Sequence, residues 1–169
     1  LSDIKRIQAY QPETESEARA RDLWLFSYLC NGMNLKDIAQ LRYRNIDEKE
    51  GTVTFHRAKT EHTSRNLKPV KAVLLQPANA IIERWGNADK RPDAYVFSVF
   101  TDDMNAKRQL DVKNQLLKLV NNYMKRIGRK LEIETKLTTY VARHSFATVL
   151  KRSGAPTEFI SESLGHKDL

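Results

Sequence analysis

The sequence contains one cysteine, Cys30, which lies within an apolar run. A single cysteine excludes an intramolecular disulfide framework and a cysteine-based metal site. We expect Cys30 to be a buried structural thiol. No apolar stretch reaches the ~20 residues that a membrane-spanning helix needs, and no signal-peptide pattern opens the chain. These absences predict a cytoplasmic protein without a membrane partner.

Acidic residues are outnumbered, with 21 Asp and Glu against 29 Lys and Arg, which gives a formal net charge of +8. This excess favours an anionic partner, nucleic acid above all. A lysine-rich solvated surface explains the charge equally well. The length of 169 residues suits one domain with a substantial core, and the sequence shows no internal repeat or low-complexity segment.

Hydrophobic periodicity predicts a mainly α-helical domain with one small antiparallel β-sheet, an α+β class. The clearest helix is expected at 112–129, where apolar residues recur at helical spacing. The expected helices span 1–9, 13–30, 34–41, 78–85, 112–129, 140–152 and 157–165, and the expected strands span 52–57, 65–74 and 95–97. The first two strands would form a hairpin whose connection holds Lys59.

Two motifs stand near the end of the chain. Residues 140–148 read Tyr-Val-Ala-Arg-His-Ser-Phe-Ala-Thr, and residues 164–166 read Leu-Gly-His. They resemble paired boxes of the tyrosine recombinases, the phage-integrase family. The family pattern is His-x-x-Arg-His-x-Phe-Ala-Thr, then Leu-Gly-His, then a nucleophilic tyrosine.

Earlier segments extend the resemblance. Residues 31–38 read Asn-Gly-Met-Asn-Leu-Lys-Asp-Ile and are similar to the family's Thr-Gly-x-Arg-x-x-Glu-Leu. Residues 41–46 are similar to its Leu-x-Trp-x-Asp-Ile, and residues 57–60 resemble the hairpin that carries its catalytic lysine. Each segment alone is a weak signal, whereas all of them in the family's order are a strong one.

The resemblance implies the fold of a recombinase catalytic domain. Its expected activity is the site-specific breaking and rejoining of double-stranded DNA through a 3′-phosphotyrosine, in a mobile-element integrase. The expected partners are double-stranded DNA and other recombinase protomers, the latter through a C-terminal tail beyond this sequence. Residues 1–169 would then be a catalytic domain truncated before its nucleophile, without the N-terminal core-binding domain that closes a clamp on DNA.

Transfer of a phosphodiester to a hydroxyl develops negative charge, which fixed cationic groups must stabilise. The resemblance assigns the phosphate clamp to Arg143, proton donation to the leaving oxygen to Lys59, and a hydrogen bond to a non-bridging oxygen to His166. We expect no cofactor and no metal, because the sequence offers no clustered set of ligands.

Three departures from the family concern catalytic positions. Asn34 stands where the first arginine belongs, and an amide cannot supply a charged fork. The candidate substitutes for this arginine are Arg42, Arg44 and Arg57. Arg57 is preferred because residues two apart on a strand share a side, which would place it beside Lys59.

The second departure is Tyr140, which replaces the family histidine and should share a helix face with Arg143. A phenol can hydrogen-bond a phosphate, although packing as a core aromatic is a rival interpretation. His144 would project from another face as a structural hydrogen-bonding residue. The third departure is the nucleophile, expected about nine or ten residues beyond His166 and so outside this sequence.

Two alternatives remain open. A non-catalytic DNA-binding module of the same fold is favoured by Asn34 and Tyr140, whereas Arg143, Lys59 and His166 argue against it. A type IB topoisomerase has a similar active site, but the wording of the boxes is closer to integrases.

Overall fold

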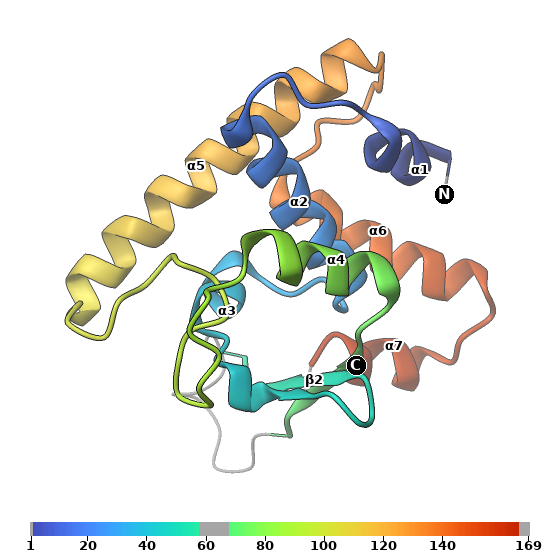
Figure 1. Ribbon diagram of the computed structural model, residues 1–169. Coiled ribbons are helices and arrows are strands. Elements are labelled where there is room, and N and C mark those ends of the chain that lie inside the picture. The colour runs from blue at the N-terminus through green and yellow to red at the C-terminus, as the bar shows by residue number, and fades with distance from the viewer. Residues whose placement is uncertain (1, 58–67, 166–169) are drawn as a thin grey trace.

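Helix α2 (Glu15–Leu29) runs through the centre of the molecule in the computed structural model, which describes residues 2–57 and 68–165. Nearly every residue in its second half is buried, including Leu23, Trp24 and Phe26. Helix α2 contacts α3, α4, α5 and α6, so it forms the core of the helical part of the fold (Figure 1).

The remaining elements surround this central helix. In chain order they are α1 (Ser2–Ala9), α3 (Leu35–Gln40), the short 3₁₀ helix η1 (Tyr43–Asn45), β1 (Ile46–Asp47), β2 (Thr52–Phe55), β3 (Val70–Val73), α4 (Gln76–Trp85), α5 (Ala106–Lys130), α6 (Thr139–Arg152) and α7 (Thr157–Ser163). The predicted mainly α-helical class with a small antiparallel sheet is confirmed.

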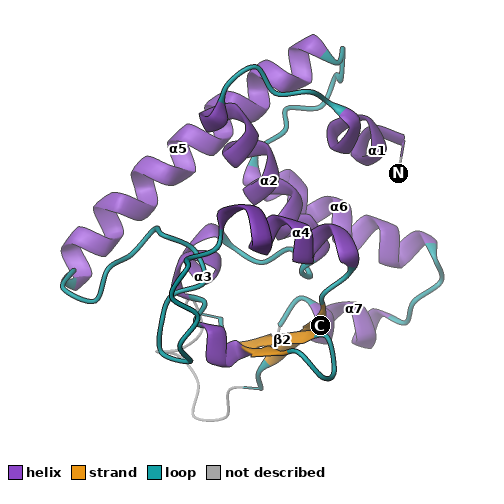
Figure 2. Ribbon diagram, viewed as in Figure 1, coloured by secondary structure: helices purple, strands orange, loops and turns teal. Residues whose placement is uncertain are grey.

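The sheet has the strand order β1-β2-β3 and is antiparallel throughout. Phe55, the last residue of β2, is paired with Val70, the first residue of β3, and both are buried. Helix α7 packs against β3, so the end of the described chain lies beside the sheet (Figures 1 and 2).

A buried carboxylate joins α2 to α4. Asp22 is 2% exposed and accepts hydrogen bonds from Arg21 Nε at 3.1 Å, Arg84 Nη1 at 2.6 Å and Trp85 Nε1 at 2.8 Å. Three donors compensate the cost of removing this charge from water. The contact fixes α4, which directly follows β3, against the central helix.

Several predicted boundaries were wrong. Strand β2 ends at Phe55 instead of residue 57, and α5 begins six positions before the predicted residue 112 because Asn105 caps it by accepting from Arg108 N. The predicted strand at 95–97 is absent from the described sheet, and only isolated bridges occur there, from Tyr95 to Arg42 and from Phe97 to Gly86.

Within residues 2–57 and 68–165, no helix combines the length and the apolarity that crossing a bilayer requires. Cys30 is fully buried, as the sequence predicted.

Candidate active site

The turn after α2 brings a backbone segment against α6. Asn31 and Gly32 both have positive φ, at 56° and 67°, which reverses the chain between α2 and α3. A Cβ atom on Gly32 would lie only 2.8 Å from Cα and from Cγ of Arg143. Glycine is therefore required at position 32 both by its backbone conformation and by the close approach of α6.

Arg143 is held by two backbone carbonyl groups from distant parts of the chain. Its Nη1 donates to the oxygen of Gly32 at 3.1 Å, and its Nη2 donates to the oxygen of Leu164 at 3.0 Å. The arginine thus joins the α2–α3 turn, α6 and the end of α7. Two fixed acceptors orient the planar guanidinium, which is the preorganisation that a phosphate clamp requires.

Arg57 lies against the same segment at the end of α7. A Cβ atom on Gly165 would be 2.7 Å from Cδ of Arg57 and 3.3 Å from its Nε. Because Leu164 accepts from Arg143 and the adjacent Gly165 touches Arg57, one dipeptide contacts both arginines. Two of the sequence-predicted site residues are therefore brought to one place.

Arg57 is buried, with 9% of its surface exposed, and so is Asp37, with 3% exposed. Burial lowers the pKa of the Arg57 guanidinium, and the attraction of the Asp37 carboxylate partly offsets this effect. Arginine keeps its charge in such surroundings. The pair therefore places a charged guanidinium inside the fold, near the start of α3.

Asn34 is the N-cap residue of α3, but its side chain makes no capping hydrogen bond. It precedes Asp37 by three positions, at the start of the helix that the family arginine would occupy. Asn34 supplies an amide at this position and no charge, so any second cation must come from another element.

Arg42 and Arg44 are engaged elsewhere. Arg42 lies over the ring of Tyr95, 4.0 Å from its centroid, and forms an ion pair with Asp102 at 3.3 Å. Arg44 forms an ion pair with Asp93 at 2.7 Å. Both arginines hold the loop that follows α4, which leaves Arg57 as the candidate next to Arg143.

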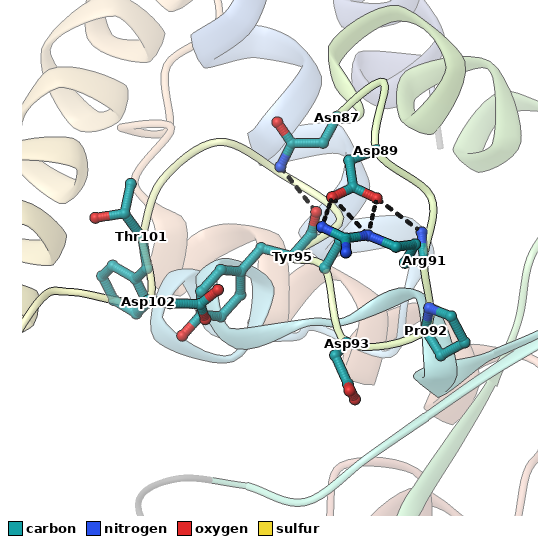
Figure 3. Close-up of a pocket in the computed structure, with 10 residues that line it drawn as sticks. Asn87, Asp89, Arg91, Pro92, Asp93, Tyr95, Thr101 and Asp102 are labelled. Carbon is teal, nitrogen blue, oxygen red and sulfur yellow. Dashed lines mark hydrogen bonds and ion pairs between the residues drawn. The ribbon is translucent and has the colours of Figure 1, made fainter.

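That loop forms the wall of an open cleft of about 660 Å³, drawn in Figure 3. Each of its three aspartates faces an arginine, the third pair being Asp89 and Arg91 at 2.8 Å. Its charges are thus paired within the chain. The residues that line it are Asn87, Asp89, Arg91, Pro92, Asp93, Ala94, Tyr95, Phe100, Thr101 and Asp102, none of which holds Arg143 or Arg57.

Tyr140 lies at the start of α6 with 72% of its surface exposed. Its ring stacks on His144, one helical turn later, with centroids 6.1 Å apart and an interplanar angle of 12°. The interpretation of Tyr140 as a core aromatic is wrong. His144 forms no side-chain hydrogen bond with any described residue, so the hydrogen-bonding role expected for it lacks support in this part of the chain.

Lys59 and His166 lie outside the residues that the structure describes, and their expected roles stay predictions. Strand alternation gives no reason to place Arg57 beside Lys59, because β2 ends two residues before Arg57. What supports Arg57 instead is its packing against Gly165.

Three contributors to this site were missed from the sequence. The carbonyl groups of Gly32 and Leu164 carry no side-chain signal and could not have been found. Asp37 could have been found, because it occupies the acidic position of the family's Thr-Gly-x-Arg-x-x-Glu-Leu motif. Its burial beside Arg57 was not anticipated from the sequence.

Comparison with known proteins finds relatives along the whole chain. Tyrosine recombinase XerA of Thermococcus kodakarensis is 26% identical over 167 residues, which cover 99% of this chain and 53% of that protein. The Tn1549 transposon integrase, solved in complex with transposon right end DNA, gives a TM-score of 0.64 at 14% identity, covering 99% of this chain and 56% of that chain. The integrase from mycobacterium phage Brujita gives a TM-score of 0.60 at 18% identity, covering 99% of this chain and 48% of that chain.

The solved structures share the fold, and this chain spans about half the length of the relatives that it matches. A family model described as the phage integrase family matches residues 2–169, almost the full sequence. The order of its motifs, the small sheet and the position of Arg143 agree with that match. The chain belongs to the phage integrase family.

Proposed function

We propose that residues 1–169 form the catalytic domain of a site-specific recombinase that breaks and rejoins double-stranded DNA through a 3′-phosphotyrosine. The observation that carries this proposal is the contact of Arg143 and Arg57 with one dipeptide, Leu164–Gly165. Two guanidinium groups whose side chains contact adjacent residues are suited to the negative charge of a phosphodiester in transfer.

The proposed reaction uses each predicted residue once. A tyrosine hydroxyl gives up its proton to water, its oxygen forms a bond to phosphorus, and the bond from phosphorus to the 5′-oxygen breaks. Arg143 and Arg57 stabilise the charge on the non-bridging oxygens, and His166 donates a further hydrogen bond there. Lys59 gives a proton to the leaving 5′-oxygen. The nucleophile itself is expected about nine or ten residues beyond His166, by resemblance to the family.

Tyr140 takes the place of the family histidine in this proposal. Its exposed phenol is free of the core and stands at the N-terminal end of α6, where it can donate a hydrogen bond to a DNA phosphate. A phenol is a poor base near neutral pH, so Tyr140 would bind and orient the phosphate without accepting a proton.

The proposed partners are double-stranded DNA and further recombinase protomers, joined through a C-terminal tail. An N-terminal core-binding domain would complete the clamp on DNA, and the protein would act in the cytoplasm, at the bacterial nucleoid. Helix α5 supports DNA binding because basic residues lie exposed along its outer face, namely Lys107, Lys118, Lys125 and Arg129.

One observation favours a non-catalytic DNA-binding module as second candidate. Asn34 leaves no charge at the position of the family's first arginine, so catalysis depends on a substitute. A type IB topoisomerase would be distinguished by relaxation of supercoiled DNA without a specific site.

The test is a nicked suicide substrate, incubated with a chain that carries residues 1–169 together with the downstream tyrosine. Denaturing electrophoresis should show a covalent protein–DNA band that is lost on Arg143→Ala and kept on Arg44→Ala. Residues 1–169 alone should form no such band, and a band there would place the nucleophile within them. Specific DNA binding without any covalent band from the longer chain would support the non-catalytic module.

A further inference from the structure

Gly165 ends α7 with a φ of 69°, and its surroundings are unusually close. A Cβ atom at this position would lie 2.6 Å from Cγ2 of Val70 and 2.7 Å from Cδ of Arg57. Distances below 3.0 Å are shorter than van der Waals contact allows, so a methyl group here must displace a neighbour. The flexible neighbour of the two is Arg57, because Val70 is buried in the sheet.

Gly154 shows that positive φ alone does not require this arrangement. It follows α6 as Gly165 follows α7, and its φ is 81°, but nothing lies within 4 Å of the place where its Cβ would be. Both glycines satisfy the left-handed conformation common after helices. Of these two glycines, only Gly165 has neighbouring side chains, those of Val70 and Arg57, in the place that a Cβ atom would occupy.

Arg57 packs against the end of α7. It lies beyond the end of β2, so strand pairing does not fix its backbone. Among the described groups around it are Gly165 at the end of α7, adjacent to Val70 of β3, and the Asp37 carboxylate of α3. The space left by Gly165 is where the aliphatic part of Arg57 runs.

We propose that Gly165 is a positioning residue for Arg57, because its missing side chain allows the end of α7 to set where the Arg57 guanidinium lies. This inference rests on the proposed function, in which Arg57 is the second cation on the phosphate. It also explains how one segment serves both arginines. Leu164 orients Arg143 through its carbonyl oxygen, and Gly165 orients Arg57 through close contact.

The test compares Gly165→Ala with Gly154→Ala in a recombinase chain that carries the nucleophilic tyrosine. Both variants place alanine at positive φ and share that backbone cost. Single-turnover cleavage should be slowed by about tenfold or more in Gly165→Ala relative to Gly154→Ala, since misplacing a catalytic group by a fraction of an ångström is costly. DNA affinity should be alike in the two variants, and the melting temperature of Gly165→Ala should be the lower one because only its methyl group displaces a neighbour.

A double mutant separates positioning from a structural effect. With Arg57→Ala, the methyl group of Gly165→Ala no longer meets Arg57, so the double variant should cleave within about twofold of Arg57→Ala alone. Losses that multiply would overturn the inference, as would a Gly165→Ala variant that cleaves like Gly154→Ala while Arg57→Ala is slow. If Arg57→Ala itself cleaved at the unmodified rate, the role of Arg57 in the proposed function would be wrong.

Should Gly165→Ala fail to fold, the same comparison is made in a Val70→Ala background. That change removes the 2.6 Å contact and keeps the 2.7 Å contact with Arg57. Slow cleavage by Val70→Ala/Gly165→Ala relative to Val70→Ala supports the inference, and equal rates overturn it.

Discussion

The indole Nε1 of Trp24 donates a hydrogen bond over 2.8 Å to the carbonyl oxygen of Thr138. Trp24 is fully buried in α2, and Thr138 is the N-cap residue of α6, where its side chain accepts from Val141 N at 3.4 Å. The start of α6 is therefore fixed to the central helix. Because α6 carries Arg143, this bond helps to fix the position of Arg143 relative to α2.

Trp24→Phe should destabilise the fold by roughly 1–3 kcal/mol, because the hydrogen bond from the buried indole to the half-buried carbonyl of Thr138 is lost and the ring becomes smaller. Hydrogen exchange should show faster opening of the first turn of α6. Trp85→Phe is the matched control, since it also removes an indole donor but from Asp22 on α2. Equal exchange in the first turn of α6 for both variants would contradict the role given to Trp24.

Arg57→Ala should raise the activation free energy of DNA cleavage by on the order of 3 kcal/mol, comparable to the loss of an oxyanion donor. The variant also lacks the guanidinium charge that attracts the buried Asp37 carboxylate, so the melting temperature of the variant should fall. Arg57→Lys keeps the charge and loses the planar fork, and should retain the fold while cleaving slowly.

Arg42→Ala and Arg44→Ala should cleave much faster than Arg57→Ala. Their ion pairs with Asp102 and Asp93 hold the loop after α4, away from the two arginines of the site. Rates are compared in single-turnover assays with the suicide substrate. Normal cleavage by Arg57→Ala together with slow cleavage by either loop variant would assign the second cation to the loop.

DNA binding by residues 1–169 should be weak and should fall steeply with salt, because contacts with backbone phosphates release counterions. Fluorescence anisotropy with duplex DNA over a salt series measures the slope of the logarithm of the binding constant against the logarithm of the salt concentration. Lys118→Ala/Lys125→Ala, on the exposed face of α5, should lower the slope by about 1–2 units if both lysines contact phosphates. An affinity that stays constant from low to physiological salt would contradict the electrostatic account.

Cys30 should resist thiol reagents in the folded protein. Burial raises the pKa of its thiol to about 12, so hardly any thiolate exists at pH 8. Reaction with an aromatic disulfide reagent should be slow until denaturant is added, and then yield one thiol per chain. A folded-state pKa above the unfolded value means that Cys30 contributes stability below its unfolded pKa and loses that contribution as the pH rises towards 12.

Helices could be predicted where helix-forming residues run long without a breaker, as in α2, or where apolar residues recur at helical spacing, as in α5. Prediction failed where an element was short. Strand β1 has two residues, too few for any periodicity, and was not anticipated. The apolar run at 95–97 predicts a strand, but Tyr95 forms a single bridge with Arg42, 53 positions earlier, and Phe97 forms one with Gly86, 11 positions earlier.

The sequence could name the arginine side chains of the candidate site, but it could not predict the tertiary contacts that position them. Arg143 and Arg57 could be named because they match or adjoin motif positions. The preference for Arg57 rested on strand alternation, which does not apply beyond Phe55. Its actual surroundings at Gly165 and Asp37 depend on the tertiary packing of α7 against β3 and of α3 against α2 and α5, which periodicity does not encode.

The bond between Arg143 and the carbonyl of Gly32 spans 111 residues of sequence, which has a consequence during protein synthesis. At ~5–20 residues per second, Gly32 is synthesised about 6–22 seconds before its partner. Closing so long a loop is also among the slower steps of folding. A chain whose translation stops before α6 carries Asp37 and Arg57 without Arg143. Such truncated products could not assemble the pair of guanidinium groups, and we expect them to leave DNA intact.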